Sequence, residues 1–205
     1  MLLDRVFAAT YDRVLRPSEE HGLADIRRRA LAGLSGTVLE IGAGTGLNLG
    51  RYPDEVEVLI VCEPAPEMAE HLRARADDFH HDLDIRDAVA EALPLADDSV
   101  DHAVSTLVLC TVDDLEQSCR ELARVIRPGG TLRLVEHIGP ADGFLGGVQR
   151  VIEPAWKIGA RGCRLTRDPR PAMTAAGFDV SSLQEGTIPA PKLLRRAVIG
   201  TANLM

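Results

Sequence analysis

Hydrophobic residues follow two alternating patterns along this chain. Short apolar runs rich in β-branched residues predict buried strands, and apolar residues repeating every three or four positions predict helices with one buried face. Strands are expected at residues 38–41, 56–62, 84–90, 102–109 and 131–135, from 177, and at 193–202. Helices are expected at residues 2–15, 19–34, 47–51, 64–76, 113–126, 144–158 and 171–176. This alternation predicts a parallel sheet with right-handed helical crossovers, closed by a C-terminal hairpin.

Turn-forming residues mark the ends of several of these elements. Pro17 is expected to end the first helix, and Gly33 and Gly36 to close the second. The arginine triplet at 27–29 is expected on a solvated face of the second helix. Residues 127–130 are expected to form a turn before the fifth strand.

Residues 38–49 predict a strand, a tight turn and the start of a helix in direct succession. The apolar run includes Glu40, and Gly42, Gly44 and Gly46 follow at alternate positions. Glycine accepts positive φ and lets a ligand approach the backbone closely. The helix start offers free N–H groups and a positive dipole end to an anion. This segment is therefore the first candidate for a ligand-binding loop.

A second acidic residue favours a nucleoside as the ligand. Glu63 ends the predicted strand at 56–62 and lies beyond the glycine loop. An acid about 20 residues after such glycines is placed to accept hydrogen bonds from ribose hydroxyls. The alternative is an ordinary strand-to-helix turn with a solvated acid. Glu40 and Glu63 together favour the nucleoside interpretation.

Further candidates fall at the carboxyl ends of the predicted strands. Open parallel sheets bind ligands outside these ends, where the strand order reverses. The ends carry residues 42–46, Glu63, residues 90–91, residues 106–107 and His137. One site at this edge is therefore expected to collect all of them.

Composition and charge limit the classes of partner. The 205 residues are expected to form a single domain, with residues 1–35 as N-terminal helices. A net charge of −8 and a pI near 5.2 argue against a nucleic-acid partner held through its phosphates. The chain has no run of 18 apolar residues, so no membrane span is expected. Asp4 and Arg5 lie near its start, where no long apolar run follows, so no signal peptide is expected. Peripheral contact with a membrane surface stays open.

Cysteine and histidine spacing indicates no metal site. The four cysteines are Cys62, Cys110, Cys119 and Cys163. They are far apart and form no C-x-x-C pair, so neither a disulfide framework nor a zinc site is expected, which fits a reducing cytoplasm. The neighbouring His80 and His81 would point in different directions on a regular element.

Residues 138–170 interrupt the alternation of strands and helices. Glycines precede the predicted apolar helix at 144–158, which holds Trp156, the single tryptophan of the chain. Because this insert follows the fifth strand at the ligand edge, it is expected to be a lid over an acceptor pocket, with a packing helix as the alternative.

The form E-x-G-x-G-x-G at residues 40–46 resembles motif I of the class I S-adenosylmethionine-dependent methyltransferases. Residues 91–95, 99–101 and 127–130 resemble methyltransferases of the ubiquinone/menaquinone-biosynthesis type. More narrowly, residues 105–110, 135–137, 153–156 and 162–167 are similar to the methyltransferase-like 7 group, the alkyl thiol methyltransferases. The resemblance covers nearly the whole chain.

This resemblance implies a Rossmann-like α/β fold with a mostly parallel seven-stranded sheet, S-adenosylmethionine as cofactor, and a small-molecule methyl acceptor. The implied cofactor-binding residues are Tyr11, Glu40, Gly42, Ala43, Gly44, Thr45, Gly46, Asn48, Glu63, Pro64, Met68, Ala90, Glu91, Ala92, Thr106 and Leu107. Two departures stand out. Animal members carry an N-terminal membrane anchor, which is not expected in this chain. The position at which the family often has an acid near adenine is occupied here by Val89. Adenine would then meet backbone N–H groups at 90–91, or Glu91 turning inward.

The same resemblance implies individual roles. The glycines would approach the methionyl part of the cofactor, with Glu40 organising the loop near the amino group and Asn48 fixing the carboxylate end. Met68 is expected to pack on adenine, and residues 106–107 to line the cofactor. Tyr11 would either close over the cofactor or pack in the core.

His137 is the candidate for a base or orienting group toward the acceptor. Its alternative is a histidine hydrogen-bonded to Glu136 or to the insert. A thiol ionises near pH 8.5 and needs little help from a base, so a thiol acceptor is favoured. A quinone-like ring and a lipid amine stay open, and the apolar insert predicts an apolar or amphiphilic acceptor.

Two other functions compete with methyl transfer. An NAD-dependent oxidoreductase would explain the glycine turn and Glu63, but the chain lacks the G-x-G-x-x-G spacing and any Tyr-x-x-x-Lys pair. An inactive methyltransferase-fold binding module would not need the intact acids and glycines. The sequence gives no indication of the oligomeric state.

Overall fold

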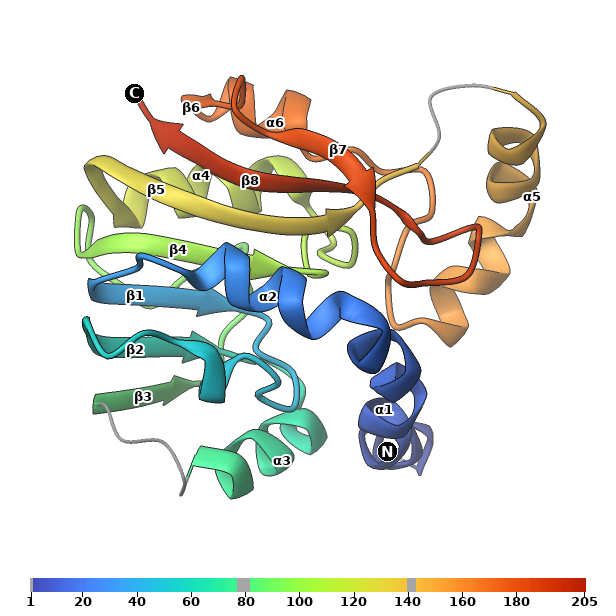
Figure 1. The fold of residues 1–205 in the computed structure, drawn as a ribbon, viewed down its shortest axis with the longest axis horizontal. Helices are drawn as coiled ribbons and strands as arrows, with labels where there is room; N and C mark the ends of the chain where they lie inside the picture. Colours follow the sequence, from blue (N-terminus) through green and yellow to red (C-terminus); the bar gives the residue numbers. More distant parts are fainter. Residues whose placement is uncertain (1, 77–81, 140–142) are drawn as a thin grey trace.

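The computed structural model describes residues 2–76, 82–139 and 143–205. Within them, one eight-stranded sheet runs through the molecule (Figure 1). Five parallel strands lie in the order β3 (Asp82–Arg86), β2 (Val56–Cys62), β1 (Gly36–Ile41), β4 (Val100–Thr106) and β5 (Ile126–His137). Antiparallel β8 (Arg196–Leu204) follows β5, and β6 (Phe178–Asp179) and β7 (Gln184–Thr187) both pair with β8.

Helices lie on both faces of the sheet. They are α1 (Leu2–Ser18), the π-helical η1 (Glu19–Leu23), α2 (Ala24–Leu31), the 3-10 turn η2 (Leu49–Arg51), α3 (Pro66–Ala76), α4 (Leu115–Val125), α5 (Phe144–Gly159) and α6 (Arg170–Ala175). None of the helices in the described part of the chain is both long and apolar enough to cross a membrane. The expected α/β fold with a mostly parallel sheet is confirmed.

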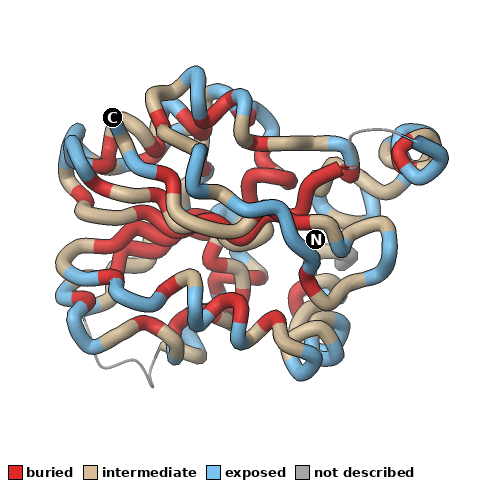
Figure 2. Tube along the Cα trace, turned by 45° about the horizontal axis from the view of Figure 1, so that its top comes forward, coloured by how far each residue is buried: buried red, intermediate tan, exposed pale blue. Residues whose placement is uncertain are grey.

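The core has separate clusters on the two faces of the sheet, because side chains alternate between these faces along each strand. Leu39 of β1 belongs to a buried cluster with Leu122 of α4, whereas the neighbouring Val38 belongs to a cluster with Leu72 of α3. Successive strand residues point to opposite faces, so both faces need helices to cover them. Figure 2 shows the buried residues following the central strands.

The strand order reverses between β1 and β4. The chain runs outward from β1 through β2 to β3, then returns to the other side of β1 as β4 and continues to β5. The loops that follow β1 and β4 therefore diverge, and a crevice at the carboxyl ends of these strands is where such sheets bind ligands.

The N-terminal helices differ from the prediction. The first helix was expected to end near Pro17, and α1 does end at Ser18, but the chain stays helical there because η1 continues to Leu23. A proline near the end of a helix removes a single N–H, and the irregularity is instead taken up at Gly22, with φ 120°. The solvated placement of Arg27 is also wrong, because this residue of α2 is buried.

Several boundaries also moved. The third strand is Asp82–Arg86 and not 84–90, and the helix expected at 47–51 is reduced to the single turn of η2. Residues 127–130 lie inside β5, which shifts register against β4 and has Gly129 at φ 79°. The eighth strand is β7, a short edge that the seven-strand expectation lacked. The adjacent histidines at 80–81 lie outside the described residues.

Candidate functional site

The carboxyl edge of the sheet brings together the glycine loop, the end of β2 and the end of β4. Gly42, Gly44 and Gly46 all have positive φ, at 55°, 59° and 81°. The backbone N–H of Gly44 donates to Glu63 Oε2 at 2.7 Å, and the N–H of Ala65 donates to Oε1 at 2.9 Å. Burial raises the pKa of Glu63, and these two hydrogen bonds oppose the shift. Glu63 therefore joins two loops while each carboxylate oxygen keeps a further lone pair.

The three glycines differ in what surrounds them. A Cβ on Gly42 would lie 2.6 Å from Val108 Cγ1, and one on Gly46 would lie 2.8 Å from Leu72 Cδ1. A Cβ on Gly44 would meet Met68 Cε at 3.5 Å, an ordinary van der Waals contact. Gly42 and Gly46 are thus closely packed against neighbouring side chains, whereas Gly44 has no such tight contact and is required by its positive φ.

Glu40 lies beneath the loop. Its carboxylate accepts hydrogen bonds from Asn48 Nδ2 at 2.8 Å and from the Tyr52 hydroxyl at 2.6 Å. Burial raises its pKa, and the two hydrogen bonds oppose this. Glu40 therefore organises the loop through Asn48 and Tyr52.

Asn48 is the centre of a buried polar network. Its Nδ2 also donates to Thr106 Oγ1 at 3.3 Å, and its Oδ1 accepts from Arg27 Nη1 at 3.1 Å. Arg27 Nε donates in turn to Glu19 Oε1 at 2.9 Å. The network links the N-terminal helices to the glycine loop and to β4. Sequence reasoning missed Arg27, because nothing in a run of three arginines marks the one that is buried.

The first helix is tied to the loop by a second network. Asp12 accepts from Thr45 Oγ1 at 2.6 Å and from Arg75 Nη2 at 2.7 Å. At the preceding residue, burial raises the pKa of Tyr11 to about 12, with Arg27 lowering it and Cys110 and Glu63 among the groups that raise it. The Tyr11 hydroxyl is therefore affected by Glu63, which follows β2, and by Cys110, which lies in the loop after β4.

The loop at 90–93 is held by α4. Glu91 Oε1 accepts from the N–H groups of Asp113 and Asp114, at 2.8 and 3.1 Å, just before the start of α4. One oxygen of the Glu91 carboxylate is thus used at the start of this helix, which does not favour the alternative in which Glu91 turns inward to adenine. Ala90 is buried, Ala92 is exposed, and Val89 is 45% exposed. Backbone groups remain as the candidates to meet adenine.

The end of β4 has an unusual conformation. Leu107 has φ 61°, and its N–H donates to the carbonyl of Val135 at 2.8 Å. A non-glycine residue in this region costs free energy, and such residues cluster at functional sites. Thr106 contacts Asn48, as described above, so the end of β4 lies beside the glycine loop; that residues 106–107 line a cofactor stays a prediction.

Glu136 shapes the loop after β4 and was not recognised from the sequence. This fully buried carboxylate accepts from Ser105 Oγ at 2.7 Å and from the N–H groups of Val108, Leu109 and Cys110. Burial raises its pKa, with the hydrogen bonds opposing. A single buried acid thus fixes the loop that faces the acceptor side.

His137 contacts the insert, which was one of the two alternatives for it. Its Nδ1 lies 4.0 Å from Cys163 Sγ, and its Nε2 is buried with no hydrogen-bond partner in the described part of the chain. The hydrogen bond from Cys110 lowers the pKa of the Cys163 thiol, burial opposes this, and His137 lowers it further. The loop after β4, the end of β5 and the insert therefore meet at the side chains of Cys110, His137 and Cys163.

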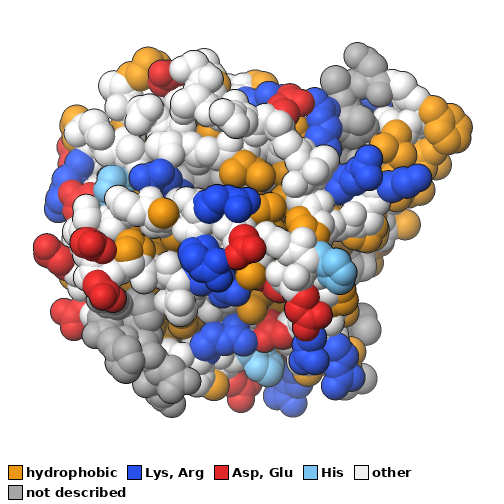
Figure 3. Space-filling model, in the orientation of Figure 1, with side chains coloured by type: hydrophobic (Ala, Val, Ile, Leu, Met, Phe, Trp, Pro, Cys, Tyr) orange, Lys and Arg blue, Asp and Glu red, His pale blue; other side chains and the backbone are white. Residues whose placement is uncertain are grey.

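The insert leaves much of its apolar surface exposed. On α5, Phe144, Val151 and Ile158 are exposed, Phe144 to 89%. Figure 3 shows hydrophobic side chains gathered at the α5 end of the molecule. Gln149 Nε2 donates to the carbonyl of Leu193 at 2.6 Å and anchors the helix. Trp156 is partly buried.

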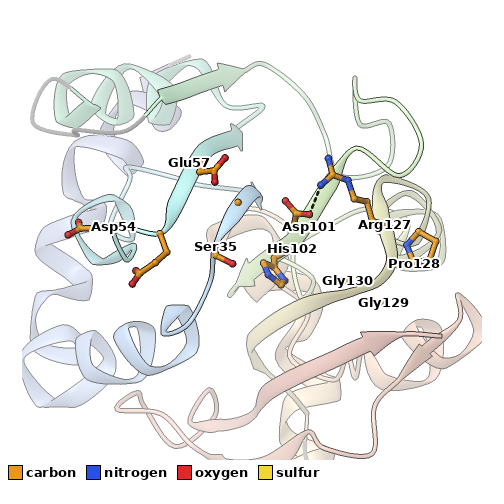
Figure 4. A pocket seen from close by; sticks show the side chains of 11 residues that line it. Ser35, Asp54, Glu57, Asp101, His102, Arg127, Pro128, Gly129 and Gly130 are labelled. Atoms are coloured by element: carbon orange, nitrogen blue, oxygen red, sulfur yellow. Dashed lines mark hydrogen bonds and ion pairs between the residues drawn. The ribbon is translucent and has the colours of Figure 1, made fainter.

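A hollow on the opposite edge contains none of the predicted site residues. Ser35, Asp54, Asp101, His102 and Arg127 line it at the amino ends of the strands (Figure 4). Asp101 Oδ2 accepts from the N–H of Thr37 at 2.8 Å, and Oδ1 accepts from Arg127. These groups stabilise the ends of β1 and β5.

Comparisons with known proteins agree on one family. Residues 39–134 match the family described as "Methyltransferase domain". The chain is 35% identical over 178 residues to the human thiol S-methyltransferase TMT1A, covering 83% of this chain and 72% of that protein. It is 30% identical to a phosphatidylethanolamine N-methyltransferase from Cereibacter sphaeroides, over 70% of this chain and 75% of that protein.

A solved structure shares the whole architecture. An S-adenosylmethionine-dependent methyltransferase from Thermotoga maritima, described as a possible histamine N-methyltransferase, aligns with a TM-score of 0.70 over 99% of both chains at 23% identity. At this identity the likeness concerns the fold, which it supports along the full length of the chain.

Proposed function

We propose that this chain, which belongs to the class I S-adenosylmethionine-dependent methyltransferases and to the group that includes the thiol S-methyltransferases, methylates the sulfur of a small apolar thiol. Thirty-five per cent identity to human TMT1A is the observation that carries the choice of a thiol. The acidic-residue and glycine geometry at the carboxyl edge supports the choice of methyl donor.

The donor is proposed to bind across the two joined loops. Glu63 would accept hydrogen bonds from the ribose hydroxyls with the lone pairs that Gly44 and Ala65 leave free. The backbone of Gly44, which lacks a Cβ, would lie against the methionyl part, and Met68, which contacts this glycine, would pack on the adenine side. Asn48 and Glu40 would position this loop without contacting the donor, since their polar atoms are bonded to each other, Tyr52, Thr106 and Arg27.

The bound cofactor supplies an activated methyl group on a positively charged sulfur. The protein's tasks are then to align the acceptor in line with that methyl group and to exclude water. The loop after β4, fixed by Glu136, would form one wall, and the end of β5 with the insert the other. His137 would orient the acceptor or take its proton.

The insert is proposed to act as a lid and to select an apolar acceptor. Its helix presents apolar side chains, and Gly143, with φ 96°, precedes it. Apolar groups over the transfer site would desolvate the sulfur nucleophile and favour a hydrophobic chain on the acceptor. The protein would then convert a membrane-permeable thiol into a thioether.

An acceptor panel tests the proposal. Release of S-adenosylhomocysteine is measured with an alkyl thiol, an alkyl amine and an alkyl-substituted phenol of matched chain length. Turnover is expected with the thiol, rising with chain length. Turnover with the amine alone would favour the chemistry named for the Cereibacter relative and contradict the proposal.

A further inference from the structure

Cys110, His137 and Cys163 meet at the carboxyl edge although they lie far apart in the sequence. Among the described residues, they form the one group of potential metal ligands whose three donor atoms all lie within 4.8 Å of one another. Cys110 lies in the loop after β4, His137 ends β5, and Cys163 follows α5. Cysteine spacing gave no hint of this, because the three elements are adjacent only in the fold.

Hydrogen bonds hold the segments of the two cysteines together. The N–H of Arg164, next to Cys163, donates to the carbonyl of Cys110 at 2.9 Å. Arg167 Nη1 donates to the carbonyls of Leu109 and Val112, at 2.9 and 2.6 Å. The insert is thus fixed to the loop after β4 at the position of both thiols. Such an arrangement lowers the cost of assembling a ligand set.

We propose that Cys110, Cys163 and His137 bind a zinc ion through two thiolates and one imidazole nitrogen, with a fourth position open. Tetrahedral zinc has Zn–S bonds near 2.3 Å and Zn–N bonds near 2.0–2.1 Å, which place the donor atoms about 3.6–3.8 Å apart. Cys163 Sγ and His137 Nδ1 are already 4.0 Å apart. Contraction of at most about 1 Å would complete the set.

The surroundings suit this ion. Two thiolates neutralise its charge, which lowers the cost of burying it. His137 is 3% exposed, and its Nε2 is buried without a hydrogen-bond partner among the described residues, as is the indole Nε1 of Trp156. The indole N–H of Trp156 could donate to a thiolate of the group, since Trp156 also acts on the Cys163 thiol, whereas Nε2 of a His137 bound through Nδ1 would point away from the ion. Cys163 is partly exposed, so an ion can reach the group from solvent.

The open position defines a role that rests on the proposed function. Of the two roles proposed for His137, the site keeps the orienting one, exerted through zinc: an acceptor thiol would lose its proton to solvent, and not to His137, on binding zinc as a thiolate. Its sulfur would then form a bond to the methyl carbon while the bond from that carbon to the cofactor's sulfonium breaks, and the electron pair stays with S-adenosylhomocysteine. The neutral thioether is a weak ligand and leaves. Zinc would thus hold the acceptor as its nucleophilic form at neutral pH.

Metal binding is measured on the full-length reduced protein without cofactor or acceptor. Zinc affinity is obtained by competition with a chromophoric chelator. Cobalt(II) serves as a second probe, through thiolate-to-cobalt absorption and quenching of Trp156 fluorescence. One ion per chain is expected, with binding about 100-fold weaker or more in Cys163→Ala and Cys110→Ala. Cys119→Ala, which changes a buried cysteine in α4, is expected to bind as the wild type does.

The outcomes separate this inference from the proposed function. Zinc binding that is absent in the wild type, or unchanged in both cysteine variants, overturns the metal site even if thiols are methylated. The wild-type cobalt spectrum decides the matter should a variant fail to fold. Zinc bound at these residues by a protein that methylates no thiol would keep the site and overturn its role in holding the acceptor.

Discussion

The backbone N–H of Gly44 donates a hydrogen bond to the carboxylate of Glu63 at 2.7 Å. This hydrogen bond joins the loop after β1 to the end of β2, although 18 residues separate the two partners along the chain. The residue expected to hold the ribose is also the residue that holds the glycine loop in position. Substitutions at either partner should affect both tasks.

Replacing Glu63 by alanine should weaken S-adenosylhomocysteine binding. Hydrogen bonds to a charged group contribute about 1.5–3 kcal/mol, which corresponds to about 10- to 150-fold in affinity. Isothermal titration calorimetry gives this value directly. Glu57→Ala is the matched control, because Glu57 is exposed near the start of β2, the strand that Glu63 follows. Equal affinities for wild type and Glu63→Ala would mean that the ribose lies elsewhere.

Alanine at two of the glycines should separate binding from stability. Gly42→Ala places a Cβ 2.6 Å from Val108 Cγ1 and should lower the free energy of unfolding by about 2–4 kcal/mol. Gly44→Ala meets only an ordinary contact with Met68, so it should lose less stability than Gly42→Ala although both have positive φ, and the added methyl group in the loop should lower cofactor affinity. Chemical denaturation and calorimetry on both variants test this. The idea fails if Gly44→Ala binds the cofactor as tightly as the wild type.

Stability at acidic pH should depend on Glu121. The hydrogen bond from Arg124 lowers the pKa of Glu121 below its ordinary value of 4.5, and the N–H of Leu93 also donates to it. A lowered pKa in the folded state gives stability that is present above the unfolded pKa and is lost as pH falls through the folded pKa. Glu121→Gln should therefore cost about 1 kcal/mol at pH 7 and progressively less below pH 4.5.

The measurement is urea denaturation of both proteins across the acidic range. Glu116→Gln, an exposed acid on the same helix, is the control. A difference between wild type and Glu121→Gln that stays constant from pH 7 to pH 3 would exclude a contribution from the charge. The loop at 90–93 would then be held by other contacts.

Trp156→Ala should raise the acceptor KM and leave cofactor affinity nearly unchanged, if α5 forms a lid. Its fluorescence in the wild type should shift when acceptor is added. Val151→Ala, at an exposed position of the same helix, controls for loss of helix propensity and apolar area. A KM equal to that of the wild type, together with lower stability, would identify α5 as a packing helix.

The sequence was sufficient for a mostly parallel sheet and for placing the glycine loop and Glu63 at its carboxyl edge. Alternating strand and helix patterns have few topological solutions, and glycines followed by an acid at the end of the next strand are local features. Glu40, Asn48 and Thr106 were named, although the structure shows Glu40 and Asn48 bonded to protein groups beneath the loop.

Residues defined by burial or by distant contacts were beyond the sequence. Arg27 looks like its two neighbours, and only its packing against Glu19 and Asn48 distinguishes it. Glu136 resembles a strand-end acid, but it accepts four hydrogen bonds from the loop after β4 and from Ser105. The direction of the Glu91 side chain depended on where α4 begins, which no local pattern specifies.

Transfer of a methyl group to sulfur is tested most directly by a competition within one tube. The protein is incubated with S-adenosylmethionine carrying an isotopically labelled methyl group and with equal concentrations of an alkyl thiol and the amine of the same chain length, and the products are identified by mass spectrometry. Methyl transfer to sulfur would give labelled methyl thioether in a one-to-one ratio with S-adenosylhomocysteine. Label on the amine, or no thioether while the cofactor is bound, would contradict it.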